Sequence, residues 1–170
     1  MKKLITIFAS IILMTLSANV MAQNTDNATA TASAKIIAPI QLENDRELNF
    51  GAIAKTSIGG NVTATPAENT VIYFENPNAA VTTLSSNKSS ARFIITGEED
   101  ALFGISFTDA SLTGTGDDMI ISDFTSSVGT TSVQLIGTSM TFYVGATLQV
   151  NPNQATGEYT GEFEVTVSYN

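Results

Sequence analysis

The chain has 170 residues with no Cys, His or Trp, and its 7 basic and 16 acidic residues give a formal net charge of −9. The absence of Cys and His excludes disulfides, thiolate or imidazole metal sites, and catalytic dyads or triads that need either side chain. Charged residues make up only 14% of the chain, fewer than the solvated faces of a helical protein require. An acidic chain repels phosphate backbones, so nucleic acid is not an expected partner.

Residues 1–22 have the pattern of an export signal. Lys2 and Lys3 precede an apolar run, 4–16, that is too short to span a bilayer comfortably, and small residues at Val20 and Ala22 follow it. We therefore predict cleavage after residue 22 rather than retention as a membrane anchor. Removing 22 of the 170 residues, two of them lysines, leaves 148 residues and changes the net charge from −9 to −11. The product is expected in the periplasm, at the cell surface or outside the cell, with no membrane insertion after cleavage.

The last two predicted strands alternate between apolar and polar residues, as half-buried strands do. In the first of them, 140–150, the apolar face is formed by Met140, Phe142, Val144, Ala146, Leu148 and Val150. A turn-rich loop, 151–157, separates it from the final strand, 159–170. One face of the final strand is formed by Tyr159, Gly161, Phe163, Val165, Val167 and Tyr169.

Shorter strands are predicted where segments rich in Thr, Val and Ile are bounded by Gly, Asn, Asp and Ser. They are Leu48–Ile53, Gly60–Thr65, Val71–Glu75, Ala91–Thr96, Phe103–Phe107, Met119–Ile121 and Ser132–Ile136. No segment after residue 22 keeps apolar residues at helical spacing for three turns, and no internal repeat is present. The sequence therefore predicts an all-β domain made of two antiparallel sheets packed face to face.

The start of the mature chain, 23–36, is a separate N-terminal arm, and the predicted domain occupies 37–170. Small or apolar residues occupy every second position of the arm, at Ala28, Ala30, Ala32, Ala34 and Ile36. Pro39 cannot donate a ladder hydrogen bond, so it marks an edge or a bulge in the strand that follows. Two interpretations are open: a first strand with a frayed beginning, or a donor arm (about 26–36) that pairs with another molecule.

Two motifs resemble those of bacterial pilus subunits. Leu48-Asn49-Phe50-Gly51 follows an alternating strand, and Gly157 precedes an alternating strand that ends at the penultimate Tyr169. The second pattern resembles the assembly motif of pilins exported by the chaperone–usher route. Over about 35–170 the chain is also similar to the secreted bacterial domain-of-unknown-function family 4402 (DUF4402), a relative of spore-coat-U-type pilins. That similarity is carried by Thr96-Gly97, Asp118-Met119, Val144-Gly145-Ala146-Thr147-Leu148 and Tyr159-Thr160-Gly161.

The pilin resemblance implies an immunoglobulin-like antiparallel β-sandwich that lacks its last strand. A periplasmic chaperone would lend a strand to the open edge, and the arm of another pilin-like subunit would replace it. The implied assembly edge comprises Gly157, Tyr159, Phe163, Val165, Val167 and Tyr169, and the implied donor arm comprises Ala28, Ala30, Ala32, Ala34 and Ile36. Many pilins carry a disulfide and bulky donor residues, whereas this chain has no Cys and its arm is rich in alanine.

Three other residue groups are candidates for metal binding, catalysis or a carbohydrate contact. The acidic turns at 98–100 and 117–118 offer oxygen ligands for weak Ca²⁺ binding, but without EF-hand spacing solvated turns are favoured. Glu162 and Glu164 share a strand face at the spacing of a glycosidase pair, but without Trp a sugar cleft is not expected. Tyr73 and Tyr143 are candidates for a carbohydrate contact or, as favoured here, for packing.

The sequence thus predicts an exported, non-catalytic structural protein with no cofactor and no metal, assembling as a pilin-like or fimbrial subunit. The alternative is a self-contained secreted β-sandwich that serves as an adhesion or ligand-binding module. A hydrolase ranks third because His and Cys are missing.

Overall fold

The structure is a computed structural model that describes residues 25–74 and 87–170, so the predicted signal peptide, 1–22, lies outside the described residues. The chain divides into two units, Met1–Lys35 and Ile36–Asn170. Residues 25–35, the described part of the first unit, are exposed and carry no helix or strand. No helix long and apolar enough to cross a membrane occurs among the residues that the structure describes.

The second unit is built from antiparallel strands, which confirms the all-β prediction for the described residues. In chain order the strands are β1 (Gln41–Arg46), β2 (Gly60–Ala64), β3 (Ile72–Phe74), β4 (Ala91–Thr96), β5 (Leu102–Phe107), β6 (Ala110–Gly114), β7 (Met119–Ser126), β8 (Val133–Gln134), β9 (Ser139–Val150), β10 (Tyr159–Thr160) and β11 (Val165–Tyr169).

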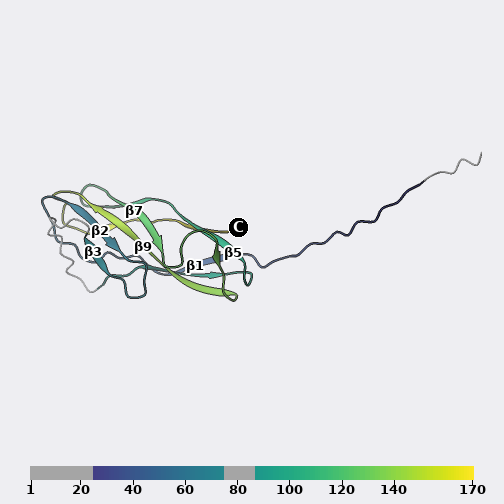
Figure 1. The fold of residues 1–170 in the computed structure, drawn as a ribbon. Coiled ribbons are helices and arrows are strands. Elements are labelled where there is room, and N and C mark those ends of the chain that lie inside the picture. The colour runs from purple at the N-terminus through teal and green to yellow at the C-terminus, as the bar shows by residue number, and fades with distance from the viewer. Residues whose placement is uncertain (1–24, 75–86) are drawn as a thin grey trace, which may run out of the picture. The chain divides into compact units, whose positions relative to one another are not determined.

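The larger sheet is organised around β9, the longest strand. The first half of β9 pairs with β4 (Phe142↔Phe93), and its second half pairs with β2 (Leu148↔Val62). Its other edge pairs with β7, as Figure 1 also shows, and the sheet continues through β6 to β10. At the opposite end β1 pairs with β4, and β3 pairs with β2. One 12-residue strand therefore holds three neighbours in place.

The smaller sheet has the order β11-β5-β8. The register of β11 on β5 runs from Val165↔Phe107 to Tyr169↔Phe103, and β8 pairs with the start of β5. The final strand of the chain therefore lies at one end of this sheet, with β5 on one side of it.

Two clusters of buried side chains form the core, and β9 contributes to both. The cluster between the two sheets comprises Ala91, Phe93, Ile95, Phe103, Ile105, Val133, Leu135, Phe142 and Val144. The other lies mainly on the larger sheet and comprises Phe50, Val62, Ala64, Ile72, Met119, Ile121, Ala146, Leu148 and Val150. Phe142 is fully buried and stacks on Phe93 of the neighbouring strand at 5.5 Å between ring centroids, and both belong to the cluster that also contains Phe103 and Ile105 of the smaller sheet.

Most predicted strands are present, with four differences. The predicted strand 48–53 is absent; this segment contains an isolated bridge at Asn49 instead. The first strand of the domain is 41–46, and β6 (110–114) was not predicted. The predicted final strand, 159–170, is interrupted, since residues 161–164 belong to neither β10 nor β11.

Candidate functional site

The predicted assembly edge is divided between two sheets. Tyr159 lies in β10 of the larger sheet and packs against the core cluster of that sheet. Val165, Val167 and Tyr169 lie in β11 of the smaller sheet and pack against the cluster between the sheets. Gly157 lies in the loop before β10. The prediction of one continuous strand over 159–170 is therefore wrong. Along this segment Tyr159, Phe163, Val165, Val167 and Tyr169 are half-buried, whereas Gly157 and Gly161 are exposed.

The interruption follows from close packing at Gly161. A Cβ atom on Gly161 would lie under 3.0 Å from the backbone of Ser111, so the chain passes directly against β6 at this point. Beyond it the chain leaves the larger sheet, and the ring of Phe163 packs between elements of both clusters. Its centroid lies 4.9 Å from that of Phe124 and 6.4 Å from that of Phe93. Phe163 thus covers the interior where the chain crosses from one sheet to the other.

The outer edge of β11 forms part of the predicted assembly edge. Among the described residues β11 pairs only with β5, so no strand lies on its second edge. Val165, Val167 and Tyr169 are half-buried, whereas the alternate residues of the strand are exposed. A half-covered apolar face beside free backbone groups is the surface to which another strand adds.

Tyr169 also joins the last strand to the beginning of the domain. Its hydroxyl donates a hydrogen bond to the Ala38 carbonyl oxygen at 3.0 Å and accepts one from the Glu98 amide at 2.7 Å. The Ala38 amide in turn donates to Glu98 Oε2 at 3.1 Å. A Cβ atom on Gly97 would overlap the tyrosine hydroxyl, which explains a glycine at this position. We call this arrangement the Tyr169 clamp.

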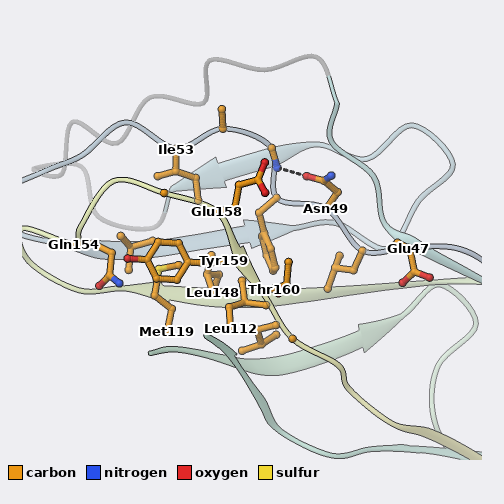
Figure 2. Close-up of a pocket in the computed structure, with 18 of the residues that line it drawn as sticks. Glu47, Asn49, Ile53, Leu112, Met119, Leu148, Gln154, Glu158, Tyr159 and Thr160 are labelled. Atoms are coloured by element: carbon orange, nitrogen blue, oxygen red, sulfur yellow. Dashed lines mark hydrogen bonds between the residues drawn. The ribbon is translucent and has the colours of Figure 1, made fainter. Parts of the chain in front are cut away.

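A groove of about 1050 Å³ with a mixed polar and apolar lining lies near the other end of β1. One wall is the segment 47–55 that follows β1, and the second wall is the segment 154–163 that contains β10. Side chains of the larger sheet form the floor, and Figure 2 shows Leu112, Met119 and Leu148 gathered there. We call this feature the 47–163 groove.

The first wall of the groove is shaped by a local turn rather than by a strand. Asn49 Oδ1 accepts a hydrogen bond from the Gly51 amide at 2.7 Å, shown as a dashed line in Figure 2. Gly51 has a φ of 77°, which favours glycine, and Phe50 between them is buried in the core. The sequence motif Leu48-Asn49-Phe50-Gly51 therefore anchors this wall. The strand predicted at 48–53 is absent here, and the sequence does not predict the groove.

The predicted donor residues Ala28, Ala30, Ala32, Ala34 and Ile36 are exposed, and none is part of a strand. Their role as donor residues therefore stays a prediction.

A network of charged and aromatic side chains lies on an exposed part of the larger sheet. Arg92 donates two hydrogen bonds to the Asp45 carboxylate, at 2.8 and 2.7 Å, and these lower the pKa of Asp45 below its ordinary 3.8. The Tyr143 hydroxyl donates to Glu68, which lowers the pKa of Glu68 below 4.5 and raises that of Tyr143 above 10.0. Arg46 lies 5.3 Å from the centroid of the Tyr143 ring.

This network accounts for the positions of both arginines of the chain. Arg46 also donates to the backbone carbonyl of Ser90 at 3.0 Å and lies 3.3 Å from Glu68. Arg46 covers one face of the Tyr143 ring, so the ring takes part in packing as the sequence favoured.

Residues of the acidic turns accept hydrogen bonds from neighbouring side chains. Asp100, with a φ of 61°, accepts a hydrogen bond from Gln134 Nε2 at 3.0 Å. Gln154 donates to the backbone carbonyl of Asp117. No group of three Asp, Glu, His or Cys residues with metal-binding geometry occurs within 25–74 and 87–170. Glu162 and Glu164, the glycosidase-like pair, are both exposed.

A family model described as "Domain of unknown function (DUF4402)" matches residues 40–169, which include β9, β11 and both walls of the groove. No significant match was found among curated proteins or among solved structures.

Proposed function

The chain belongs to the DUF4402 family, and on the basis of its open edge we propose that it is a non-catalytic structural protein of the cell exterior. Its copies assemble by β-strand complementation, in the manner of pilin or fimbrial subunits with an immunoglobulin-like sandwich. Its partners are other subunits of the same kind and a periplasmic chaperone that covers the edge before assembly.

The observation that carries the proposal is the single pairing of β11. An edge strand with a half-buried apolar face invites association with a further strand, and soluble proteins usually protect such edges with charge, proline or a covering loop. The inward residues Val165 and Val167 carry none of these protections, and the nearest acidic residue, Glu164, is on the opposite face. The outer edge of β11 is thus suited to pairing with a strand of another molecule.

The arm supplies the complementary part. Its period-two pattern places small apolar residues on one face and Thr, Ser and Lys on the other, as a strand with one buried face requires. Strand addition draws its affinity from main-chain hydrogen bonds and its specificity from the alternate side chains. Because alanines bury little surface, the backbone bonds carry most of the affinity in this chain, at about 0.5–1.5 kcal/mol each.

Removing the arm tests the proposal. Protein starting at residue 23 is expected to form concentration-dependent oligomers in sedimentation velocity, or to need a chaperone to remain soluble. Protein starting at residue 37 is expected to be monomeric and to bind an added peptide of residues 26–36. A peptide of the same composition in which the Ala and Thr positions are shuffled to break the alternation is the matched control.

Equally stable monomers from both proteins, together with no binding of the peptide, would contradict strand complementation. The self-contained adhesion or ligand-binding module would then become the better interpretation.

A further inference from the structure

The outward surface of the larger sheet has a charged part and an uncharged part. The charged part is the network of Arg92 and Tyr143, on β4 and the first half of β9. The chain at 64–66 passes directly against Gly145, where a Cβ atom would lie under 3.0 Å from this backbone, and it separates the two parts. Beyond Gly145 no outward-facing side chain carries a formal charge in β2, β3, β6, the rest of β9 and β7 as far as Ser122, as the structure describes them. We call this second part the neutral face.

The neutral face contains a row of side chains on four neighbouring strands. The row consists of Tyr73 on β3, Thr63 on β2, Thr147 on β9 and Ser122 on β7, and each is paired directly with the next. Figure 1 shows these strands beside one another. The hydroxyls of Thr63 and Thr147 share a hydrogen bond of 2.9 Å, and Tyr73 at the end of the row is 46% exposed. Over ~14 Å, at ~4.8 Å between strands, the row therefore presents an aromatic ring followed by three hydroxyls.

Hydrogen-bonding groups extend the neutral face beyond this row. Asn61 pairs with Gln149 two positions farther along β2 and β9, and each amide offers donors and an acceptor. Ile120 on β7 is 51% exposed. At the border of the face the Asp123 carboxylate accepts a hydrogen bond from the Ser122 hydroxyl at 3.0 Å. The face thus combines several neutral hydrogen-bonding groups with little exposed hydrocarbon.

We propose that the neutral face binds an uncharged polysaccharide, with the Tyr73 ring as the surface on which a sugar ring stacks. The apolar side of a sugar ring packs well on an aromatic ring whose polar tip stays in water. Sugar hydroxyls both donate and accept hydrogen bonds, and hydroxyl and amide side chains offer the same two functions. A row of ~14 Å is longer than one sugar ring, so the ligand is a chain of sugars. The face belongs to the larger sheet, so this binding is separate from strand addition at β11.

Charge selects this ligand over other partners. A chain of net charge −9 repels a polyanion. A basic partner would gain no ion pair from the uncharged rows. A protein partner would need an apolar interface core, but the exposed Tyr73 and Ile120 are separated by β2 and β9. A neutral ligand rich in hydroxyls is therefore the partner that these groups complement.

Affinity electrophoresis tests the class of ligand. The mature protein, starting at residue 23, is run in native gels with and without a soluble polysaccharide, beside a marker protein that binds no sugar. Dextran, mannan and laminarin are the uncharged probes, and alginate is the anionic probe. We expect at least one uncharged probe to slow the protein relative to the marker, and alginate to have no effect.

Substitutions test the position, with the polysaccharide that slows the protein. Tyr73→Ala should weaken the affinity at least ~10-fold because the stacking ring is lost, whereas Tyr73→Phe keeps the ring and should stay within about threefold. Gln149→Ala removes one amide and should weaken the affinity about two- to tenfold. Ile136→Ala truncates a 76% exposed residue outside the face and is the matched control, with unchanged affinity. Thermal melts confirm that each variant is folded.

Three results would overturn the proposal. Slowing by alginate equal to or greater than that by the uncharged probes would overturn the choice of a neutral ligand. No slowing by any of the probes would overturn polysaccharide binding altogether. Native affinity in Tyr73→Ala would overturn the neutral face as the binding site.

Discussion

Replacing Tyr169 with phenylalanine isolates the contribution of the clamp, because only the hydroxyl is removed. The hydroxyl makes two hydrogen bonds, to the Ala38 carbonyl and from the Glu98 amide. At a net ~0.5–1.5 kcal/mol for each bond, the free energy of unfolding should fall by ~1–3 kcal/mol. For a domain of about 150 residues, this lowers Tm by roughly 3–9 °C.

Tyr159→Phe is the matched control. The Tyr159 hydroxyl makes one hydrogen bond, to the Ala155 carbonyl at 3.0 Å, so its loss should cost about half as much. Urea unfolding followed by circular dichroism gives both values, and hydrogen exchange at the Glu98 amide should accelerate only in Tyr169→Phe. Equal stability of the two variants, with unchanged exchange at Glu98, would refute the clamp.

The remaining predictions concern the core, the pH dependence, the register and the processing. Gly145→Ala should destabilise the domain by more than ~1 kcal/mol, since a Cβ atom there would lie under 3.0 Å from the backbone at the end of β2 and just beyond it. A variant with the same Tm as the native protein would contradict this close approach. Because the pKa of Glu68 is lower in the folded protein than in the unfolded chain, the ionised carboxylate stabilises the fold above about pH 4.5. This contribution is lost as the pH falls through the pKa of Glu68 in the folded protein. Glu68→Gln should therefore reduce the loss of unfolding free energy at acid pH. An unchanged loss would contradict the hydrogen bond between Tyr143 and Glu68. Val165→Asp should lower stability by ~1–3 kcal/mol while Glu164→Lys stays within ~0.5 kcal/mol, and the reverse order in thermal melts would mean a register shifted by one residue. Intact-mass analysis of exported protein should show loss of residues 1–22, and an apolar N-terminus retained in membranes would oppose export as a soluble product.

The strands were predictable where side-chain alternation is strong. The bounds of β4 agree with the prediction at both ends, and those of β9 within one residue, because buried apolar residues recur every second position in both. Strand β6 was missed because Leu112 is its one large apolar residue. A strand without a regular buried face leaves no period-two signal.

The division of the final strand was not predictable from the same signal. Alternation records which side chains face the interior, and both sheets face a shared interior around Phe163. The pattern from Tyr159 to Tyr169 therefore continues unchanged while the chain moves from one sheet to the other. The interruption depends on the contact of Gly161 with Ser111, which lie 50 positions apart in the sequence.

The groove and the clamp were missed for a related reason. The groove wall at 47–55 is an irregular segment held by an asparagine turn, and irregular segments have no periodicity to detect. The clamp joins residues 131 positions apart. The sequence motif includes the penultimate Tyr169, but no neighbouring residue in the sequence indicates which backbone groups its hydroxyl reaches.

The position of β9 in the chain has a consequence for folding kinetics. This strand begins at Ser139 of 170 residues, yet β2, β4 and β7 all depend on it for pairing. The pairings of β9 with β2 and β4, and of β11 with β5, therefore close long loops, which gives the domain a high contact order and a folding time in the millisecond-to-second range rather than microseconds. A nascent chain that has not yet reached residue 150 lacks the complete strand on which the larger sheet is assembled. Its apolar strands then remain exposed, and this interval is where aggregation competes with folding.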